Sequence, residues 1–196
     1  MTRLADVAYG NAADAPLVSM RGARIIIAVA LVALLGALVA PAARSGKAGT
    51  RVTLTSLESG VLSALNQIRA EHGLQPVKIS ARLTAASAQH SREMGTGGYF
   101  EHNSQDGTAF WKRIGRWYAS SGYRYWSVGE NLLWSSPDVD ANRALELWMN
   151  SPEHRANILT ARWREIGISA QHFAAAPGSY KGLEVTIITT DFGVRR

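Results

Sequence analysis

Apolar positions recur at helical spacing along the chain beyond residue 54. In a segment that ends at Gly73, Leu57, Val61, Leu65 and Ile68 fall on one face. The sequence Thr55-Ser56-Leu57-Glu58 in front of them fits a capping box, which predicts a helix start. A second helix is expected from Ser80 to the glycine-rich break at 95–98. Its inward face is expected to carry Leu83, Ala86, Ser87, His90 and Met94.

Three shorter helices are expected, over about 108–119, from Ser136-Pro137 and from Ser151-Pro152. A serine followed by proline is typical of an N-cap and a first helical position. Segments 166–172 and 183–192 are rich in β-branched residues, and small residues separate them, which predicts a hairpin with a longer loop. The pattern predicts an α+β domain in which helices flank a small antiparallel sheet.

An export segment precedes this domain. Residues 25–43 include no charged residue and follow Arg21 and Arg24. Ala40-Pro41-Ala42 favours signal cleavage, whereas the length of the run also permits a retained membrane anchor. Translation starts at Met1 or at Met20, which lies just ahead of the basic pair. We expect an extension with a signal or anchor over 1–43, a linker over 44–53 and a domain over 54–196.

The composition and net charge restrict the kinds of partner that the protein is expected to bind. The 196 residues include no cysteine, so an exported domain must fold without disulfides. A net charge of +6 favours contact with an anionic envelope surface. The arginines, Arg69 and Arg113 among them, are scattered without a basic run, which indicates a solvated surface rather than a nucleic-acid site. We expect a monomer that binds no nucleic acid.

Two histidines and one carboxylate lie in three polar blocks that we interpret as loops facing one cleft. The blocks are FEHNSQDG at 100–107, GENL at 129–132 and WMNSPEHRANIL at 148–159. The positive end of a helix dipole favours a neutral imidazole at His154. His102, His154 and Glu130 form a donor set that suits catalytic zinc. The local HExxH spacing that would make a zinc site specific is missing.

Together these blocks resemble the CAP or sperm-coating-protein (SCP) domain, in the cysteine-free form of secreted bacterial proteins. This superfamily includes cysteine-rich secretory proteins, antigen 5 and plant pathogenesis-related proteins. The resemblance runs from about Leu57 to Gly193 and implies a three-layer α-β-α sandwich. It implies a cavity lined by His102, Glu130, Ser151, His154 and Asn157. Ser151 stands where many relatives carry a second glutamate, which weakens a two-carboxylate mechanism.

The resemblance implies a secreted or surface-anchored protein that binds a lipid or small amphiphile at the cell envelope and requires no cofactor. The alternative is a hydrolase of peptide or envelope material, with zinc or another divalent metal on His102 and His154 and with Glu130 as general base. The sequence has no GxSxG, Ser-x-x-Lys or cysteine nucleophile, so an enzyme is the less expected interpretation. The aromatic residues around GENL fit an apolar ligand wall or the core: Tyr123, Tyr125, Trp126 and Trp134.

Overall fold

The computed structural model describes residues 2–4, 8–11 and 52–196, and local sequence signals set the limits of its two longest helices. Helix α1 spans Ser56–Glu71, and its capping box is complete: Glu58 N donates to Thr55 Oγ1 at 3.2 Å, and Thr55 N donates to Glu58 Oε2 at 2.8 Å. Helix α2 spans Ala81–Gly97 and ends at Gly98, whose φ of 70° suits glycine. The predicted inward face of α2 is buried.

The three shorter helices are α3 (Phe110–Trp117), α4 (Ala141–Asn150) and α5 (Pro152–Ile158). The predicted start of α4 at Ser136-Pro137 is wrong, because Asp140 is the N-cap and its Oδ1 accepts from Arg143 N at 2.8 Å. The start of α5 at Pro152 is confirmed. The Ser-Pro pair therefore marks a helix start at only one of its two occurrences.

The strands extend further than the sequence pattern indicates. Strands β5 (Glu165–Ala176) and β6 (Leu183–Arg195) form the expected hairpin, and β3 (Lys78–Ile79) pairs in parallel with β5. Strand β4 (Trp126–Ser135) was not predicted, and it contains the GENL block that we interpreted as a loop. Every residue of β4 is buried, so the strand shows no alternation of apolar and polar positions.

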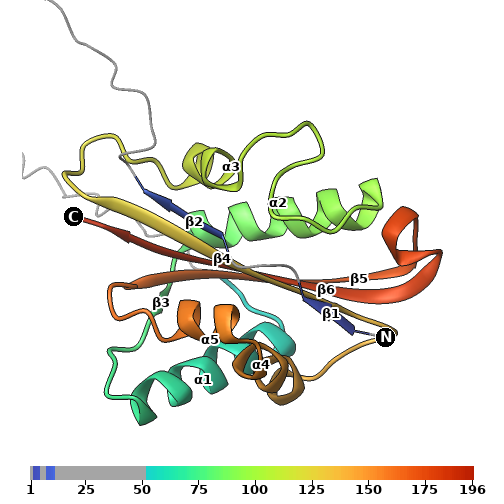
Figure 1. Cartoon of the computed structure of the whole chain (residues 1–196), viewed down its shortest axis with the longest axis horizontal. Coiled ribbons are helices and arrows are strands. Elements are labelled where there is room, and N and C mark those ends of the chain that lie inside the picture. Colours follow the sequence, from blue (N-terminus) through green and yellow to red (C-terminus); the bar gives the residue numbers. More distant parts are fainter. Residues whose placement is uncertain (1, 5–7, 12–51) are drawn as a thin grey trace, which may run out of the picture. The chain divides into compact units, whose positions relative to one another are not determined.

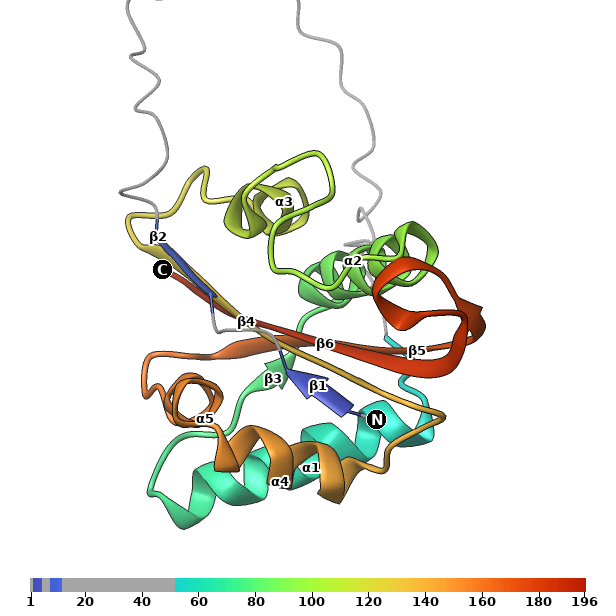
Figure 2. The same cartoon turned by 45° about the vertical axis from the view of Figure 1, so that its right-hand side comes forward.

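The sheet lies between two layers of helices (Figure 1). Its order is β1-β4-β6-β5-β3, and β2 also pairs with β4. Helices α2 and α3 cover one face, and α1, α4 and α5 cover the other, in both views (Figures 1 and 2). The three-layer α-β-α sandwich is confirmed, with a mixed rather than purely antiparallel sheet because of β3.

The outer edge of β4 carries two short strands from the N-terminal stretch, β1 (Thr2–Leu4) and β2 (Ala8–Asn11). We had expected residues 1–43 to lie outside the domain, so these strands were not anticipated. An open sheet edge offers unpaired N–H and C=O groups to any extended segment within reach. The expected export segment at 25–43 lies outside the described residues. Among the described residues, no helix is long and apolar enough to cross a membrane.

Core residues fill both sides of the sheet. On the α1, α4 and α5 side, Trp148 and Trp163 are fully buried, and Trp163 stacks on Phe192. The two tryptophans beside GENL, Trp126 and Trp134, also belong to the core. The expectation of an aromatic ligand wall is therefore not met by these two side chains.

Candidate functional site

Glu130 lies near the middle of β4, with its side chain on the face covered by α2 and α3. Consecutive side chains of a strand point to opposite faces, and Asn131 contacts α5 on the other side of the sheet. The Glu130 side chain is fully buried. A buried carboxylate requires charged or hydrogen-bonding partners, and α3 and the loop that follows α2 supply them.

Both carboxylate oxygens of Glu130 are engaged. His102 Nδ1 lies 2.7 Å from Oε1, and Arg113 Nη2 donates to Oε2 at 2.7 Å. The same Arg113 nitrogen donates to the His102 carbonyl oxygen at 3.1 Å, which ties the loop to α3. Burial alone would raise the pKa of Glu130, but the charge of Arg113 and the contacts with His90 and His102 outweigh it and hold that pKa below its ordinary value. Glu130 is therefore an ionised carboxylate.

Asp191 is a second buried carboxyl group directly opposite Glu130, on β6. Ser87 Oγ on α2 donates to Asp191 Oδ2 at 2.9 Å. Burial, together with the negative charge of Glu130, raises the pKa of Asp191 well above its ordinary value. Beside Arg113, Glu130 is thus the ionised carboxyl group, and Asp191 is the one that tends to bind a proton.

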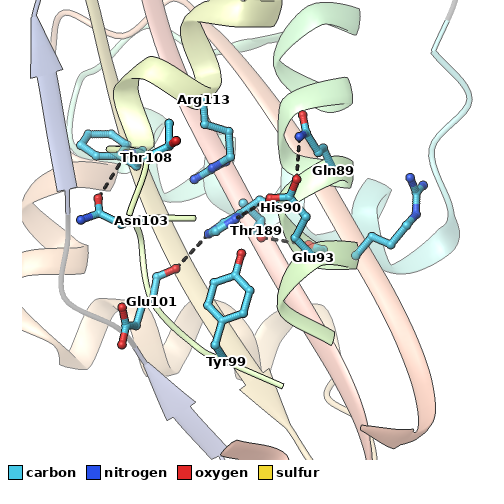
Figure 3. Close-up of polar contacts among 12 residues, drawn as sticks. Gln89, His90, Glu93, Tyr99, Glu101, Asn103, Thr108, Arg113 and Thr189 are labelled. Carbon is cyan, nitrogen blue, oxygen red and sulfur yellow. Dashed lines mark hydrogen bonds and ion pairs between the residues drawn. The ribbon is translucent and has the colours of Figure 1, made fainter. Parts of the chain in front are cut away.

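His90, Glu93 and Tyr99 continue this network toward the surface (Figure 3). The His90 ring is fully buried, and its Nε2 lies 2.9 Å from the Glu101 carbonyl oxygen. A carbonyl oxygen only accepts, so Nε2 carries the hydrogen. His90 Nε2 also lies 4.0 Å from Glu130 Oε1, and the ring meets Tyr99 edge to face.

The structure brings His102 and Glu130 together but separates His154 from them. His154 lies on α5, and its backbone oxygen accepts from Asn131 Nδ2 at 3.3 Å on the opposite face of the sheet from Glu130. Ser151 Oγ lies 2.7 Å from His154 Nδ1, and Asn157 Nδ2 donates to Asn131 Oδ1 at 2.8 Å. The prediction that His102, Glu130 and His154 face one cleft is therefore wrong. The reason is that GENL forms a strand, in which Glu130 and Asn131 face opposite ways.

These positions do not fit a metal shared by His102 and His154. The Glu130 carboxylate that would complete such a site is already neutralised by Arg113. Among the described residues, no group of three or more His, Cys, Asp or Glu side chains is arranged to hold an ion. With both oxygens engaged and its pKa lowered, Glu130 is also a poor general base.

Arg113 and Asp191 are the site residues that sequence reasoning missed. We had interpreted Arg113 and Arg69 as solvated, yet both side chains are fully buried. Arg113 shares its helical face with Phe110 and Ile114, and that spacing was the available signal. Asp191 stands next to Phe192 in a strand rich in β-branched residues, and an acidic residue in such a strand requires partners when it is buried.

A row of hollows follows the seam between α1 and α4 on the other side of the sheet. The central hollow has a volume of about 340 Å³ and is lined by Ala64, Gln67, Ile68, Glu71, Asn142, Leu145, Glu146 and Met149. A second hollow shares Ala64, Gln67 and Asn142 with it, and a third, between α4 and α5, shares Met149. We call these three hollows the α1–α4 groove.

Comparison with known proteins gives a family match over most of the domain. The model of the CAP family, described as the cysteine-rich secretory protein family, matches residues 62–180. Two Bacillus subtilis (strain 168) proteins are similar. The uncharacterized membrane protein YlbC is 28% identical over 133 residues, which is 68% of this chain and 36% of YlbC. The uncharacterized protein YkwD is 29% identical over 117 residues, 59% of this chain and 43% of YkwD. The chain thus spans less than half the length of either relative.

Solved structures share the fold. An outer surface protein of Borrelia burgdorferi matches with a TM-score of 0.58 and 18% identity, over 76% of this chain and 99% of that one. An extracellular protein with an SCP domain from Bacillus anthracis matches with a TM-score of 0.55 and 23% identity, over 74% of this chain and 45% of that one.

Proposed function

We propose that this chain, which belongs to the cysteine-rich secretory protein (CAP) family, is an extracytoplasmic module that binds a lipid or other small amphiphile. The secretory character of the family and the uncharged segment at 25–43 both favour a location outside the cytoplasm. The net charge of +6 favours residence next to anionic envelope polymers or headgroups.

The α1–α4 groove is the observation that supports this ligand class. Its floor contains Ala64, Ile68, Leu145 and Met149, whereas its rim carries polar or charged side chains such as Gln67. The central hollow thus has an apolar floor and a polar rim, which suits a ligand with an alkyl chain and a hydrophilic head. Burying a chain of methylene groups stabilises such a complex by about 0.8 kcal/mol per group.

A hydrolase is less well supported by the same geometry. Its general base would be Glu130, which is buried and paired with both His102 and Arg113. The second carboxyl group, Asp191, is also fully buried, where attacking water has no access. These features favour a structural role for the charged network.

Filling the groove tests the proposal. In Ala64→Trp, the indole would occupy the central hollow, so the affinity of the exported protein for a fluorescent fatty acid should fall more than about tenfold, or 1.4 kcal/mol. Ala175→Trp is the matched control, because Ala175 is exposed on β5. Equal affinities for wild-type protein and Ala64→Trp would refute this binding site.

A further inference from the structure

A basic surface covers α3 and the loop that joins α3 to β4. Residues 107–129 include no acidic residue, whereas α3 carries Lys112 and Arg116 and the loop carries Arg124. All three of these side chains are exposed. Because Lys112 and Arg116 are four residues apart, they lie on the same side of the helix. That side does not include the buried residues of α3, so it faces solvent.

Two large aromatic side chains are exposed beside these basic groups. Trp117 at the end of α3 and Tyr123 in the loop are each 43% exposed. Leu183 is the only other large hydrophobic side chain that is exposed among the described residues. Single exposed apolar residues are common, but several in one place indicate a contact surface.

The C-terminal end of β6 adds further basic groups to this surface. The backbones of Tyr125 and Arg196 exchange two hydrogen bonds, of 2.9 and 3.0 Å. The Arg196 guanidinium lies 5.0 Å from the centre of the Tyr125 ring, and that of Arg195 lies 4.8 Å from the centre of the Tyr123 ring. Figures 1 and 2 show the loop beside the C-terminus. Basic residues that are scattered in the sequence are therefore brought together by the fold.

We call this surface the α3 patch. It consists of Lys112, Arg116, Trp117, Tyr123, Arg124 and Arg196.

The acidic groups near the α3 patch leave most of its charge uncompensated. Asp106 lines the same pocket as Arg116, and Glu165 accepts a hydrogen bond from a tyrosine hydroxyl group. Within the part of the chain that the structure describes, no salt bridge engages Lys112, Arg116 or Arg124. These cations are therefore available to an anionic partner.

The combination of cations with exposed aromatic rings favours a lipid surface over a dissolved polyanion. Lysine and arginine are attracted to anionic headgroups, and tryptophan and tyrosine prefer the interface between headgroups and acyl chains. A dissolved wall polymer would contact the cations but leave Trp117 and Tyr123 in water. A single-stranded nucleic acid also offers charge and stacking rings, but the extracytoplasmic location proposed above favours lipid.

We propose that the α3 patch docks the domain on the surface of an anionic lipid bilayer, with its basic groups at the headgroup phosphates and with Trp117 and Tyr123 at the interface. The α3 patch lies on the opposite side of the sheet from α1 and α4 (Figure 1). The α1–α4 groove therefore stays open while the domain is docked. The inference rests on the proposed extracytoplasmic location and not on amphiphile binding.

Nuclear magnetic resonance of the exported, isotope-labelled protein with lipid nanodiscs tests this contact. The nanodiscs contain equal parts of phosphatidylglycerol and phosphatidylcholine, with a spin label on some headgroups. We expect the label to broaden the backbone signals of residues 111–125 and 195–196. Because the readout is resolved by residue, it reports the docking surface whether or not the segment at 25–43 is retained.

The broadening should disappear with nanodiscs of phosphatidylcholine alone and in high salt, because headgroup charge and screening control the attraction. Equal broadening with neutral nanodiscs, or broadening confined to α1 and α4, would overturn the proposal. Tighter binding of a single-stranded oligonucleotide than of anionic nanodiscs would also overturn it.

Charge variants separate docking from folding. Each basic group near an anionic surface strengthens association by about fivefold, so Lys112→Gln/Arg124→Gln should weaken binding to anionic nanodiscs by about tenfold or more. Lys78→Gln/Lys181→Gln is the matched control, because it removes the same charge from exposed positions outside the α3 patch. Its binding should fall clearly less. Thermal unfolding verifies that each variant folds, and equal losses in the two double variants would contradict a specific surface.

An aromatic variant tests the interfacial contact. Trp117→Ser/Tyr123→Ser keeps every charge of the α3 patch, so it should weaken binding to nanodiscs but leave binding to dissolved polyphosphate unchanged. Nanodisc binding equal to that of the wild-type protein would contradict the assignment of a bilayer as the partner.

Discussion

Glu130 is a buried carboxylate with one permanent cationic partner, so its charge matters to folding. In Glu130→Gln, Arg113 would remain charged and lose its ion pair in the protein interior. Breaking a buried pair by removing one partner costs about 3 to 5 kcal/mol. We therefore expect a loss of that size in the free energy of unfolding, measured by urea denaturation. The double variant Glu130→Gln/Arg113→Met should recover much of it, and a double variant as unstable as the single one would contradict this account.

Asp191 should give stability an unusual dependence on pH. Burial and the charge of Glu130 raise its pKa above the ordinary 3.8, so the folded state favours the protonated acid. Its contribution is complete below that ordinary value and is lost as pH rises through the raised pKa. The contribution of Glu130 to the free energy of unfolding depends on pH in the opposite sense. Because the pKa of Glu130 is lowered, its contribution is lost only as pH falls through that pKa.

Asp191→Asn isolates the contribution of Asp191 to this pH dependence, because asparagine is uncharged and its Oδ1 can still accept a hydrogen bond from Ser87. As pH rises above the ordinary value of 3.8, we expect the decline in the free energy of unfolding to be smaller in this variant than in the wild-type protein. Equal slopes in the two proteins would show that Asp191 does not titrate in this range.

The chemistry of the site was only partly predictable from single residues. His102 and Glu130 were identified, and the structure joins them at 2.7 Å. Its partner Arg113 was not identified, because an arginine side chain is usually exposed. The burial of Arg113 depends on the carboxylate of Glu130, which belongs to another element. His154 was grouped with the wrong residues, because local sequence does not reveal which face of a sheet a side chain occupies.

At the scale of elements, the caps of α1 and α2 offer a direct comparison. Thr55 accepts a hydrogen bond from Glu58 N, whereas the side chain of Ser80 makes no capping bond. Thr55→Ala should lower the free energy of unfolding by about 1 kcal/mol. Ser80→Ala should cost clearly less, as followed by urea denaturation of both variants. A larger loss for Ser80→Ala would mean that the capping geometry does not determine helix stability here.

Helices with one buried face were easier to predict than the central strand. The inward face of α2 follows directly from its spacing, since the other face meets water. Strand β4 is buried on both faces and contains Gly129 and Asn131, residues that are uncommon in strands. Gly129 is needed there because a Cβ would come within 2.7 Å of Asn157 Oδ1 on α5. Packing between layers, not local preference, thus determines the sequence of β4.

At the scale of the whole molecule, β1 and β2 raise the question of how much the N-terminal stretch contributes to the fold. Strand β4 is also paired along its full length with β6. We therefore expect residues 45–196 to form a soluble monomer that unfolds cooperatively in a thermal scan. A molten or insoluble product would mean that β1 and β2 are required to cover the edge of β4.

The central claim is that an amphiphile occupies the α1–α4 groove, and mapping its contacts tests this most directly. The exported, isotope-labelled protein would be titrated with a single-chain fatty acid below its critical micelle concentration. We predict backbone shifts concentrated at residues 60–71 and 140–156, with small shifts in α2. Shifts confined to the α2 face, or no saturable shifts at all, would contradict the claim.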